Sequence, residues 1–280
     1  MKHLRRTAGA AAVSVILLAT LASCGEESPQ IESTSGDAMG HIHGLGIDPS
    51  DGALYAASHL GLFLVEDGAP PRRVGEAWHD LMGFLVIGSG HFVASGHPDL
   101  ASDLPTHLGL IESTDAGVTW KQTSLPGEAD FHALDGSEAL IVGYEGLTGR
   151  LVVTRDRENW TTVDQRPVVD VASAPDSRDL LATTPTGELL RYRGGSAARV
   201  RTVAAPPLAY IDWAHDDLVV GVSADGRVHV SRDGGQSWTK EARLPGPPEA
   251  LEVTSAGWYA AAEGAIFEST DAGDTWSRLA

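Results

Sequence analysis

One short pattern, S-x-D-x-G-x-[T/S]-W, occurs three times in this 280-residue chain. Each residue type suits a strand–turn–strand unit. Asp tolerates left-handed backbone geometry and accepts hydrogen bonds from turn amides, Gly supplies a positive φ at low cost, and Trp opens the next strand as a large apolar group. The residues that define the three copies are Asp115, Gly117 and Trp120, then Asp233, Gly235 and Trp238, then Asp271, Gly273 and Trp276. The chain therefore repeats one specific turn.

The spacing of this turn sets the fold class. A weaker fourth copy, with Asp156 and Trp160 in the defining places, lacks the glycine and is one residue shorter. Successive aspartates are 41, 77 and 38 residues apart, and the middle interval is close to two periods, which indicates one eroded copy. A period of about 40 residues with several short strands is typical of β-propellers. We predict an all-β propeller over residues 39–280 with six four-stranded antiparallel blades, five or seven blades being the alternatives.

These repeats resemble the Asp-box, or bacterial neuraminidase (BNR), repeats of the sialidase-like superfamily. The resemblance covers most of the chain and implies the propeller fold, but Asp-boxes occur in enzymes and non-enzymes alike. Four further motifs are similar to those of bacterial lipoprotein propellers that are labelled glycosyl hydrolases. The motifs are H-x-H-G-L from His41, H-D-x-M-G-F from His79, G-H-P-D from Gly96 and D-F-H from Asp130. This second resemblance implies the fold and an anchored location, and it implies no substrate.

The first residues have the features of a lipoprotein signal. Residues 1–23 contain a basic start and an apolar stretch, and the tetrapeptide that ends at Cys24 matches a lipobox, in which the cysteine is acylated. The alternative is an ordinary secretory signal with a chance cysteine. Residues 24–38 are mostly small and polar and are predicted to tether the domain to the membrane. We therefore expect an exported palmitoylated lipoprotein on the outer side of the bacterial cell membrane.

Charge limits the class of partner. Removal of the predicted signal takes away three positive charges and no negative one, so the net charge moves from −18 to −21. Such a surface repels nucleic acid and anionic lipid. Cys24 is the only cysteine, so no disulfide can form within the chain. We expect a monomer that contacts the membrane through its lipid, binds no nucleic acid, and meets an envelope protein or a small ligand at the propeller mouth.

Strand polarity places the histidines. In a blade with strands a to d, the a–b and c–d turns lie on one face, and the b–c turns and the links between blades lie on the other. The Asp-boxes are c–d turns, and we call their face the bottom. Seven histidines of blades 1 to 3 fall in b–c turns or at the start of a strands, which places them on the top face. They are His41, His43, His59, His79, His97, His107 and His132.

This grouping predicts a ligand or metal site. His41 and His43 lie on the same side of one strand, a spacing that lets both imidazoles reach one metal ion. Met82 among imidazoles suits copper, whereas Asp80 or Asp99 suits zinc or another divalent ion. The candidate ligands are His41, His43, His79, His97, Asp99 and His132, with His59, His107, Asp80 and Met82 as weaker candidates. The alternative is that these histidines only hydrogen-bond groups around the channel.

Catalytic signatures are weak. Sialidases need an arginine clamp for the substrate carboxylate, and the chain has neither an Arg-Ile-Pro motif nor arginine in the predicted blade-opening strands. Glycoside hydrolysis needs two carboxylates about 5–10 Å apart. Its candidates near the top face or the channel are Asp80, Asp99, Asp130, Glu145, Asp170 and Asp212. We predict a non-enzymatic binding or assembly module, and the alternative is a glycoside hydrolase that uses top-face carboxylates.

Overall fold

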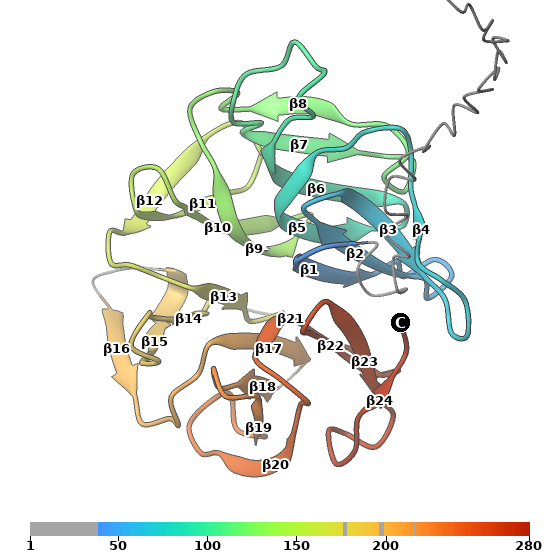
Figure 1. Ribbon diagram of the computed structural model, residues 1–280. Helices are drawn as coiled ribbons and strands as arrows, with labels where there is room; N and C mark the ends of the chain where they lie inside the picture. The colour runs from blue at the N-terminus through green and yellow to red at the C-terminus, as the bar shows by residue number, and fades with distance from the viewer. Residues whose placement is uncertain (1–38, 176–177, 196–198, 216) are drawn as a thin grey trace, which may run out of the picture. The chain divides into compact units, whose positions relative to one another are not determined.

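Each run of about forty residues folds into four successive antiparallel strands, and six such sheets surround a common centre (Figure 1). The computed structural model describes residues 39–280 apart from 176–177, 196–198 and 216. The predicted six-bladed propeller of four-stranded blades is confirmed. Residues 1–38, with the predicted signal peptide, Cys24 and tether, lie outside the described residues. Within those that are described, no helix is long and apolar enough to cross a membrane.

The first three blades follow one another without exchange of strands. Blade 1 consists of β1 (Ile42–Ile47), β2 (Leu54–Ser58), β3 (Gly61–Val65) and β4 (Arg72–Arg73). Blade 2 consists of β5 (Asp80–Gly88), β6 (His91–His97), β7 (Leu110–Ser113) and β8 (Lys121–Ser124). Blade 3 consists of β9 (Phe131–Ser137), β10 (Leu140–Glu145), β11 (Arg150–Thr154) and β12 (Trp160–Asp164).

The last three blades repeat this order. Blade 4 consists of β13 (Asp170–Ser173), β14 (Leu180–Thr183), β15 (Leu189–Tyr192) and β16 (Val200–Val203), with the 3₁₀ helix η1 (Arg193–Gly195) between the last two strands. Blade 5 consists of β17 (Tyr210–His215), β18 (Leu218–Val222), β19 (Arg227–Ser231) and β20 (Thr239–Arg243). Blade 6 consists of β21 (Pro248–Val253), β22 (Trp258–Ala262), β23 (Ala265–Ser269) and β24 (Ser277–Arg278). The first strand of every blade faces the centre.

Burial within a blade follows its position in the sheet. Second strands are covered on both faces, so β2 and β14 are buried along their whole length and their sequences show no alternation of apolar and polar residues. Fourth strands lie at the rim, and both residues of β24 are exposed. The core therefore consists of layers between blades.

Six apolar clusters fill the six interfaces between neighbouring blades. Four of them include an Asp-box tryptophan, namely Trp120, Trp160, Trp238 and Trp276. Phe131 and Trp160 stack with ring centres 4.6 Å apart between blades 2 and 3. These tryptophans therefore pack between neighbouring sheets. Blades 1 and 4, which have no recognisable box, contribute no such tryptophan among the described residues.

Polar contacts complete the ring at its inner edge. The Oδ2 atom of Asp170 accepts the N–H of Ile211 at 2.8 Å, and the Oδ2 atom of Asp212 accepts the N–H of Val253 at 2.6 Å. In each pair the carboxylate belongs to one blade and the N–H to the next. Between blades 6 and 1, the Oε2 atom of Glu249 accepts the N–H of Ile42 at 3.0 Å. These contacts tie the inner strands of neighbouring blades to one another around the channel.

Candidate functional site

Imidazoles and carboxylates gather on the top face of the propeller. We call this set the histidine mouth, and it consists of His41, His43, His59, Asp80, His97, His107, Asp130 and His132. The side chains come from the entry to the first strand of blades 1 to 3 and from the b–c connections of blades 1 and 2. The structure thus brings together six of the seven histidines that strand polarity assigns to the top face.

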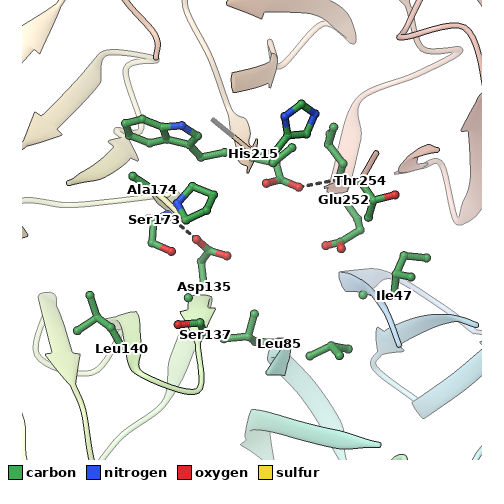
Figure 2. A pocket seen from close by; sticks show the side chains of 18 of the residues that line it. Ile47, Leu85, Asp135, Ser137, Leu140, Ser173, Ala174, His215, Glu252 and Thr254 are labelled. Atoms are coloured by element: carbon green, nitrogen blue, oxygen red, sulfur yellow. Dashed lines mark hydrogen bonds between the residues drawn. The ribbon is translucent and has the colours of Figure 1, made fainter. Parts of the chain in front are cut away.

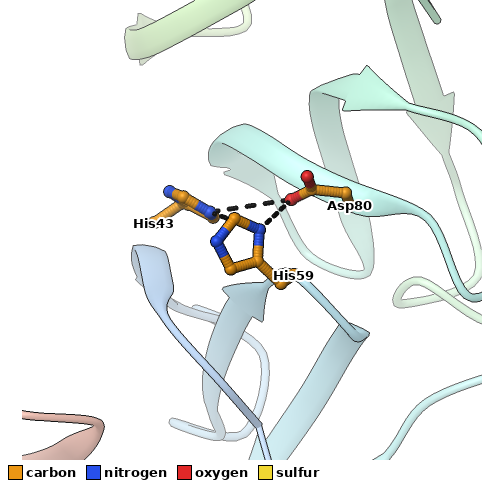
Figure 3. A group of neighbouring side chains, drawn as sticks. All are labelled: His43, His59 and Asp80. Atoms are coloured by element: carbon orange, nitrogen blue, oxygen red, sulfur yellow. Dashed lines mark hydrogen bonds and ion pairs between the residues drawn. The ribbon is translucent and has the colours of Figure 1, made fainter. Parts of the chain in front are cut away.

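His43, His59 and Asp80 form the first triad of the mouth (Figure 3). His43 lies on β1, His59 in the β2–β3 turn, and Asp80 at the start of β5. The Nδ1 atom of His59 lies 3.2 Å from His43 Nε2 and 2.8 Å from Asp80 Oδ1. Burial and the neighbouring His59 and His41 lower the pKa of His43 to about 4. The His43 ring is therefore neutral at neutral pH and offers a lone pair.

His97, His107 and Asp130 form the second triad. Asp130 Oδ2 lies 3.4 Å from His97 Nε2 and 3.8 Å from His107 Nδ1. The Asp130 side chain is only 6% exposed, yet its Oδ1 atom has no hydrogen-bond partner among the described residues, and neither has the buried Nδ1 of His107. Buried polar atoms without partners are rare in folded proteins. This triad therefore presents two atoms without hydrogen-bond partners, Asp130 Oδ1 and His107 Nδ1, to which a metal ion or another ligand can bind.

Asp130 is held as a carboxylate. Burial opposes its ionisation, but the hydrogen bond from His132 Nε2 at 2.9 Å, together with the neighbouring imidazoles of His132, His97 and His107, lowers the pKa of Asp130. The same hydrogen bond raises the pKa of His132. An ionised carboxylate accepts hydrogen bonds or binds a cation, and it has no proton to donate.

Both triads fit a divalent transition metal ion. The three donor atoms of each triad lie within 4.8 Å of one another. Around tetrahedral zinc, bonds of about 2.0–2.1 Å place neighbouring donors about 3.3 Å apart, and the closest donor pairs here range from 2.8 to 3.8 Å. Two imidazole nitrogens and one carboxylate oxygen suit Zn²⁺ and Cu²⁺. Three protein donors also leave one position open for a further ligand.

Two predicted ligands pair with each other outside the triads. His79 Nδ1 accepts the N–H of Asp99 at 3.0 Å, and burial lowers the pKa of His79. Asp99 Oδ1 in turn accepts the N–H of Ala101 at 2.8 Å. Because both side chains already have partners, they hold the long β6–β7 loop beside the mouth.

His41 and Met82 flank the first triad. His41 Nδ1 lies 3.3 Å from Glu249 Oε2, and its ring meets that of His43 edge to face, with centres 4.8 Å apart. Met82 lies two residues beyond Asp80 on β5 and is half-buried. The ligand role of both side chains stays a prediction.

Asp130 was missed as a metal-ligand candidate, because sequence reasoning considered it only as a carboxylate for hydrolysis. A signal was present in the chain. Asp80 opens β5 and Asp130 immediately precedes β9, so both acids stand at the entry to an inner strand of neighbouring blades. Acids at this position lie around the same opening.

The Asp-boxes form closed local networks. Asp233 Oδ1 accepts the Ser231 hydroxyl at 2.7 Å and the N–H of Ser237 at 2.8 Å, while Oδ2 accepts the Ser237 hydroxyl at 2.6 Å. The boxes at Asp115 and Asp271 repeat these contacts. Each box carboxylate is therefore satisfied within its own turn.

One expectation about the boxes is wrong. The aspartate does not adopt the left-handed conformation; the residue after it does, as do the box glycines. Ala116 and Ala272 have φ values of 56° and 58°, and Arg157 has 62° in the shortened copy. The chain turns after the aspartate because its carboxylate must face the amides that follow. The N–H of Ala116 also bonds the carbonyl of Gly90 in the a–b turn, at 2.9 Å, so that turn and this box share one face.

The opposite end of the channel opens into a cavity of about 850 Å³ (Figure 2). Its lining includes Asp135, Asp212 and Glu252, and burial raises the pKa of all three carboxyls. Burial also raises the pKa of Asp170, on the channel wall, to about 7. Because Asp135, Asp170 and Asp212 each accept a backbone N–H from the next blade, they belong to the scaffold.

Comparisons with known proteins agree on the fold. No family model matches this chain, and no curated protein matches it. Among solved structures, YCF48 bound to D1 peptide has a TM-score of 0.53 at 16% identity, over 85% of this chain and 81% of that chain. YCF48 from Cyanidioschyzon merolae has 0.51 at 15%, over 85% and 84%. XC5397 from Xanthomonas campestris, a gluconolactonase, has 0.64 at 12%, over 81% and 85%. At such identities, the chain is similar to these proteins in its propeller architecture.

Proposed function

We propose that this chain is an exported, lipid-anchored β-propeller that binds divalent transition metal ions at its histidine mouth, as a non-enzymatic binding or assembly module. The observation that carries the proposal is the second triad. Asp130 Oδ1 and His107 Nδ1 are buried without hydrogen-bond partners among the described residues, and the other oxygen of Asp130, Oδ2, lies 3.4 Å from His97 Nε2. A bound Zn²⁺ or Cu²⁺ would satisfy this donor set.

The surroundings of the triads support an ion that exchanges with solvent or with a partner. The side chains of His59 and His97 are 47% and 36% exposed, so an ion can reach both triads from solvent. Each triad supplies three donors, whereas structural zinc sites are usually closed by four. The open position suits an ion that is received, held and passed on, or one that also binds a group from a partner.

The same geometry disfavours glycoside hydrolysis at this face. That reaction needs one carboxyl protonated as a general acid. The His132 hydrogen bond and the surrounding imidazoles hold Asp130 ionised. Glu145 accepts the N–H groups of Leu147 and Thr148 at 2.7 and 3.0 Å. These two carboxylates are therefore committed to roles other than proton donation.

A protein partner in the envelope completes the proposal. YCF48 has been solved with a D1 peptide bound, so a propeller of this architecture can bind a peptide. Trp78 is exposed in the link between β4 and β5, and Leu100 and Leu104 are exposed in the β6–β7 loop, both of which are top-face connections. Exposed apolar side chains around a polar site are typical of protein contacts.

Metal binding is tested on the full chain, purified in detergent and stripped with a chelator. Titration calorimetry with Zn²⁺, and absorption spectroscopy with Co²⁺ as a probe, should show saturable binding that weakens at least about 100-fold in His107→Ala, since loss of a ligand should exceed the 10–100-fold cost of losing an outer-shell partner. His229→Ala, on β19 of blade 5, is the matched control and should bind like wild type. Absence of binding, or equal loss in both variants, contradicts the proposal.

Anchoring is tested separately. Cys24→Ser removes the only thiol that could carry the lipid, so the protein should move from the membrane fraction to the soluble fraction after cell breakage. A Ser23→Ala variant, which keeps the cysteine, serves as the control. Retention of Cys24→Ser in the membrane fraction would show that the lipid anchor is not what holds the chain there.

A further inference from the structure

The two oxygens of Asp80 face different triads. Asp80 Oδ1 lies 2.8 Å from His59 Nδ1 and 3.6 Å from His43 Nε2, within the first triad. Asp80 Oδ2 lies 3.4 Å from Nδ1 of His97, which belongs to the second triad. One carboxylate therefore contacts both groups of candidate ligands.

His97 continues this link into the second triad. Its Nδ1 meets Asp80 and its Nε2 lies 3.4 Å from Asp130 Oδ2. Of these two contacts, the one with Asp80 has the geometry of a hydrogen bond, and a carboxylate accepts it. In the neutral ring the proton therefore lies on Nδ1 and the lone pair on Nε2. Metal-binding histidines commonly donate their second ring N–H to a carboxylate in this way, which fixes the tautomer and the orientation of the ring.

We propose that the mouth holds two metal ions in coupled sites and that Asp80 serves both of them. Through Oδ1 it is a ligand of the first site, with His43 and His59. Through Oδ2 it is the positioning residue of the second site, where it orients His97. This inference rests on the proposed metal binding, and it adds the number of ions and the residue that couples them.

The two sites differ in whether their ligand atoms already have partners. The donors of the first triad already contact one another, with His59 Nδ1 between His43 and Asp80. The second triad has two buried atoms without partners among the described residues. The second site therefore fills first. Two dications that share one carboxylate repel each other, and an ion on Oδ1 draws electron density from Oδ2, so each ion weakens binding of the other by the same factor.

Two variants of the full chain separate the two roles of Asp80. His43→Ala and Asp80→Asn each remove a ligand of the first site, but only Asp80→Asn removes the carboxylate that faces His97. In Zn²⁺ and Co²⁺ titrations, wild type should bind two ions and each variant one. The remaining site should be about 10–100-fold weaker in Asp80→Asn than in His43→Ala, the usual cost of losing an outer-shell partner.

A measurement without metal checks the same point. In long-range ¹H–¹⁵N NMR spectra of the chelator-treated chain, His97 should carry its proton on Nδ1 in wild type and in His43→Ala. In Asp80→Asn it should populate both tautomers, because an amide can donate as well as accept.

The outcomes distinguish this inference from the proposed function. A wild-type chain that binds no ion overturns both. A single ion in wild type, equal affinity of the remaining site in the two variants, or an unchanged His97 tautomer in Asp80→Asn overturns the coupling alone.

Discussion

The Asp-box turns and the histidine mouth are both built around carboxylates, but they recruit their partners from different distances along the chain. Asp233 is satisfied by groups within four residues of it. Asp130 meets His97 and His107 of the neighbouring blade and His132 of its own, and its Oδ1 keeps no partner among the described residues. A carboxylate whose hydrogen bonds all come from its own turn stabilises the scaffold. A carboxylate whose partners come from two blades, and which keeps one oxygen without a partner among the described residues, indicates a binding site.

The largest expected effect is on stability, at a box tryptophan. Trp160 stacks on Phe131 and donates a hydrogen bond to Ser124 Oγ at 3.1 Å. Trp160→Ala should lower the free energy of unfolding by about 3 kcal/mol, since it empties part of a blade interface. Urea denaturation measures this loss, and Zn²⁺ affinity at the mouth should stay at the wild-type value. If Trp160→Ala keeps the wild-type free energy of unfolding but loses Zn²⁺ affinity, the proposed separation between scaffold boxes and histidine mouth is wrong.

The next effect is on metal affinity, at the mouth. Asp130→Asn keeps the shape of the side chain and removes the charge that faces three imidazoles. Zn²⁺ binding at the second triad should weaken at least about 100-fold, more than an outer-shell change would cause. Asp233→Asn provides the matched change in a box and should leave Zn²⁺ affinity unchanged while lowering the melting temperature. If Asp233→Asn weakens Zn²⁺ binding as much as Asp130→Asn does, the two regions do not have separate roles.

A third effect contrasts box and channel carboxyls through pH. Hydrogen bonds from Ser237 and Ser231 lower the pKa of Asp233 to about 2, so its stabilising contribution is full above its ordinary pKa and is lost as pH falls toward 2. Burial raises the pKa of Asp170 to about 7. For Asp170 the sign is opposite: stability is highest below its ordinary pKa near 4 and falls as pH rises to about 7.

Denaturation between pH 4 and 8 measures the Asp170 effect. Because Asp170 is only partly buried, we expect its share of the decline to be about 2 kcal/mol. Asp170→Asn should remove this share, and Asp233→Asn should leave the profile in this range unchanged. A decline of equal size in Asp170→Asn and wild type would show that Asp170 is already ionised in the folded protein at low pH.

The smallest expected effect is a difference in stability between two variants that each replace an Asp-box glycine. Gly273 and Gly235 occupy the same box position with φ values of 93° and 84°. A Cβ atom at Gly273 would lie 2.6 Å from the Trp258 ring, whereas at Gly235 its nearest neighbour would be a Leu181 methyl at 3.5 Å. Gly235→Ala should cost about 1 kcal/mol from backbone strain, and Gly273→Ala about 2 kcal/mol because the ring must also move. Equal melting temperatures for the two variants would contradict this difference.

The fold was predictable because its signal is local and repeated. Each box closes on itself, so its sequence recurs wherever a c–d turn occurs, and the intervals between boxes count the blades even where blade 4 has lost its copy. Strand polarity then placed His59 and His97 on the same face although they are far apart in sequence. What failed was a detail of the turn, where the left-handed residue follows the aspartate.

The site was predictable only as a group of residue types on one face. Asp99 lies in the long β6–β7 loop and resembles a ligand in sequence, but its partner is His79. Asp130 closes the second triad only because β9 packs beside β5 and β6, which brings it to His97 and His107. Such pairings depend on how far each loop folds back over the channel, and no repeat in the sequence reports that.

The most direct test of metal binding at the mouth is anomalous diffraction at the zinc absorption edge, from crystals of the full chain grown with Zn²⁺. We predict an anomalous peak about 2.0–2.2 Å from His97 Nε2, His107 Nδ1 and a carboxylate oxygen of Asp130. A weaker second peak should lie among His43, His59 and Asp80. A structure whose zinc peaks lie only outside the histidine mouth, or whose mouth stays without a peak at saturating Zn²⁺, would contradict the proposal.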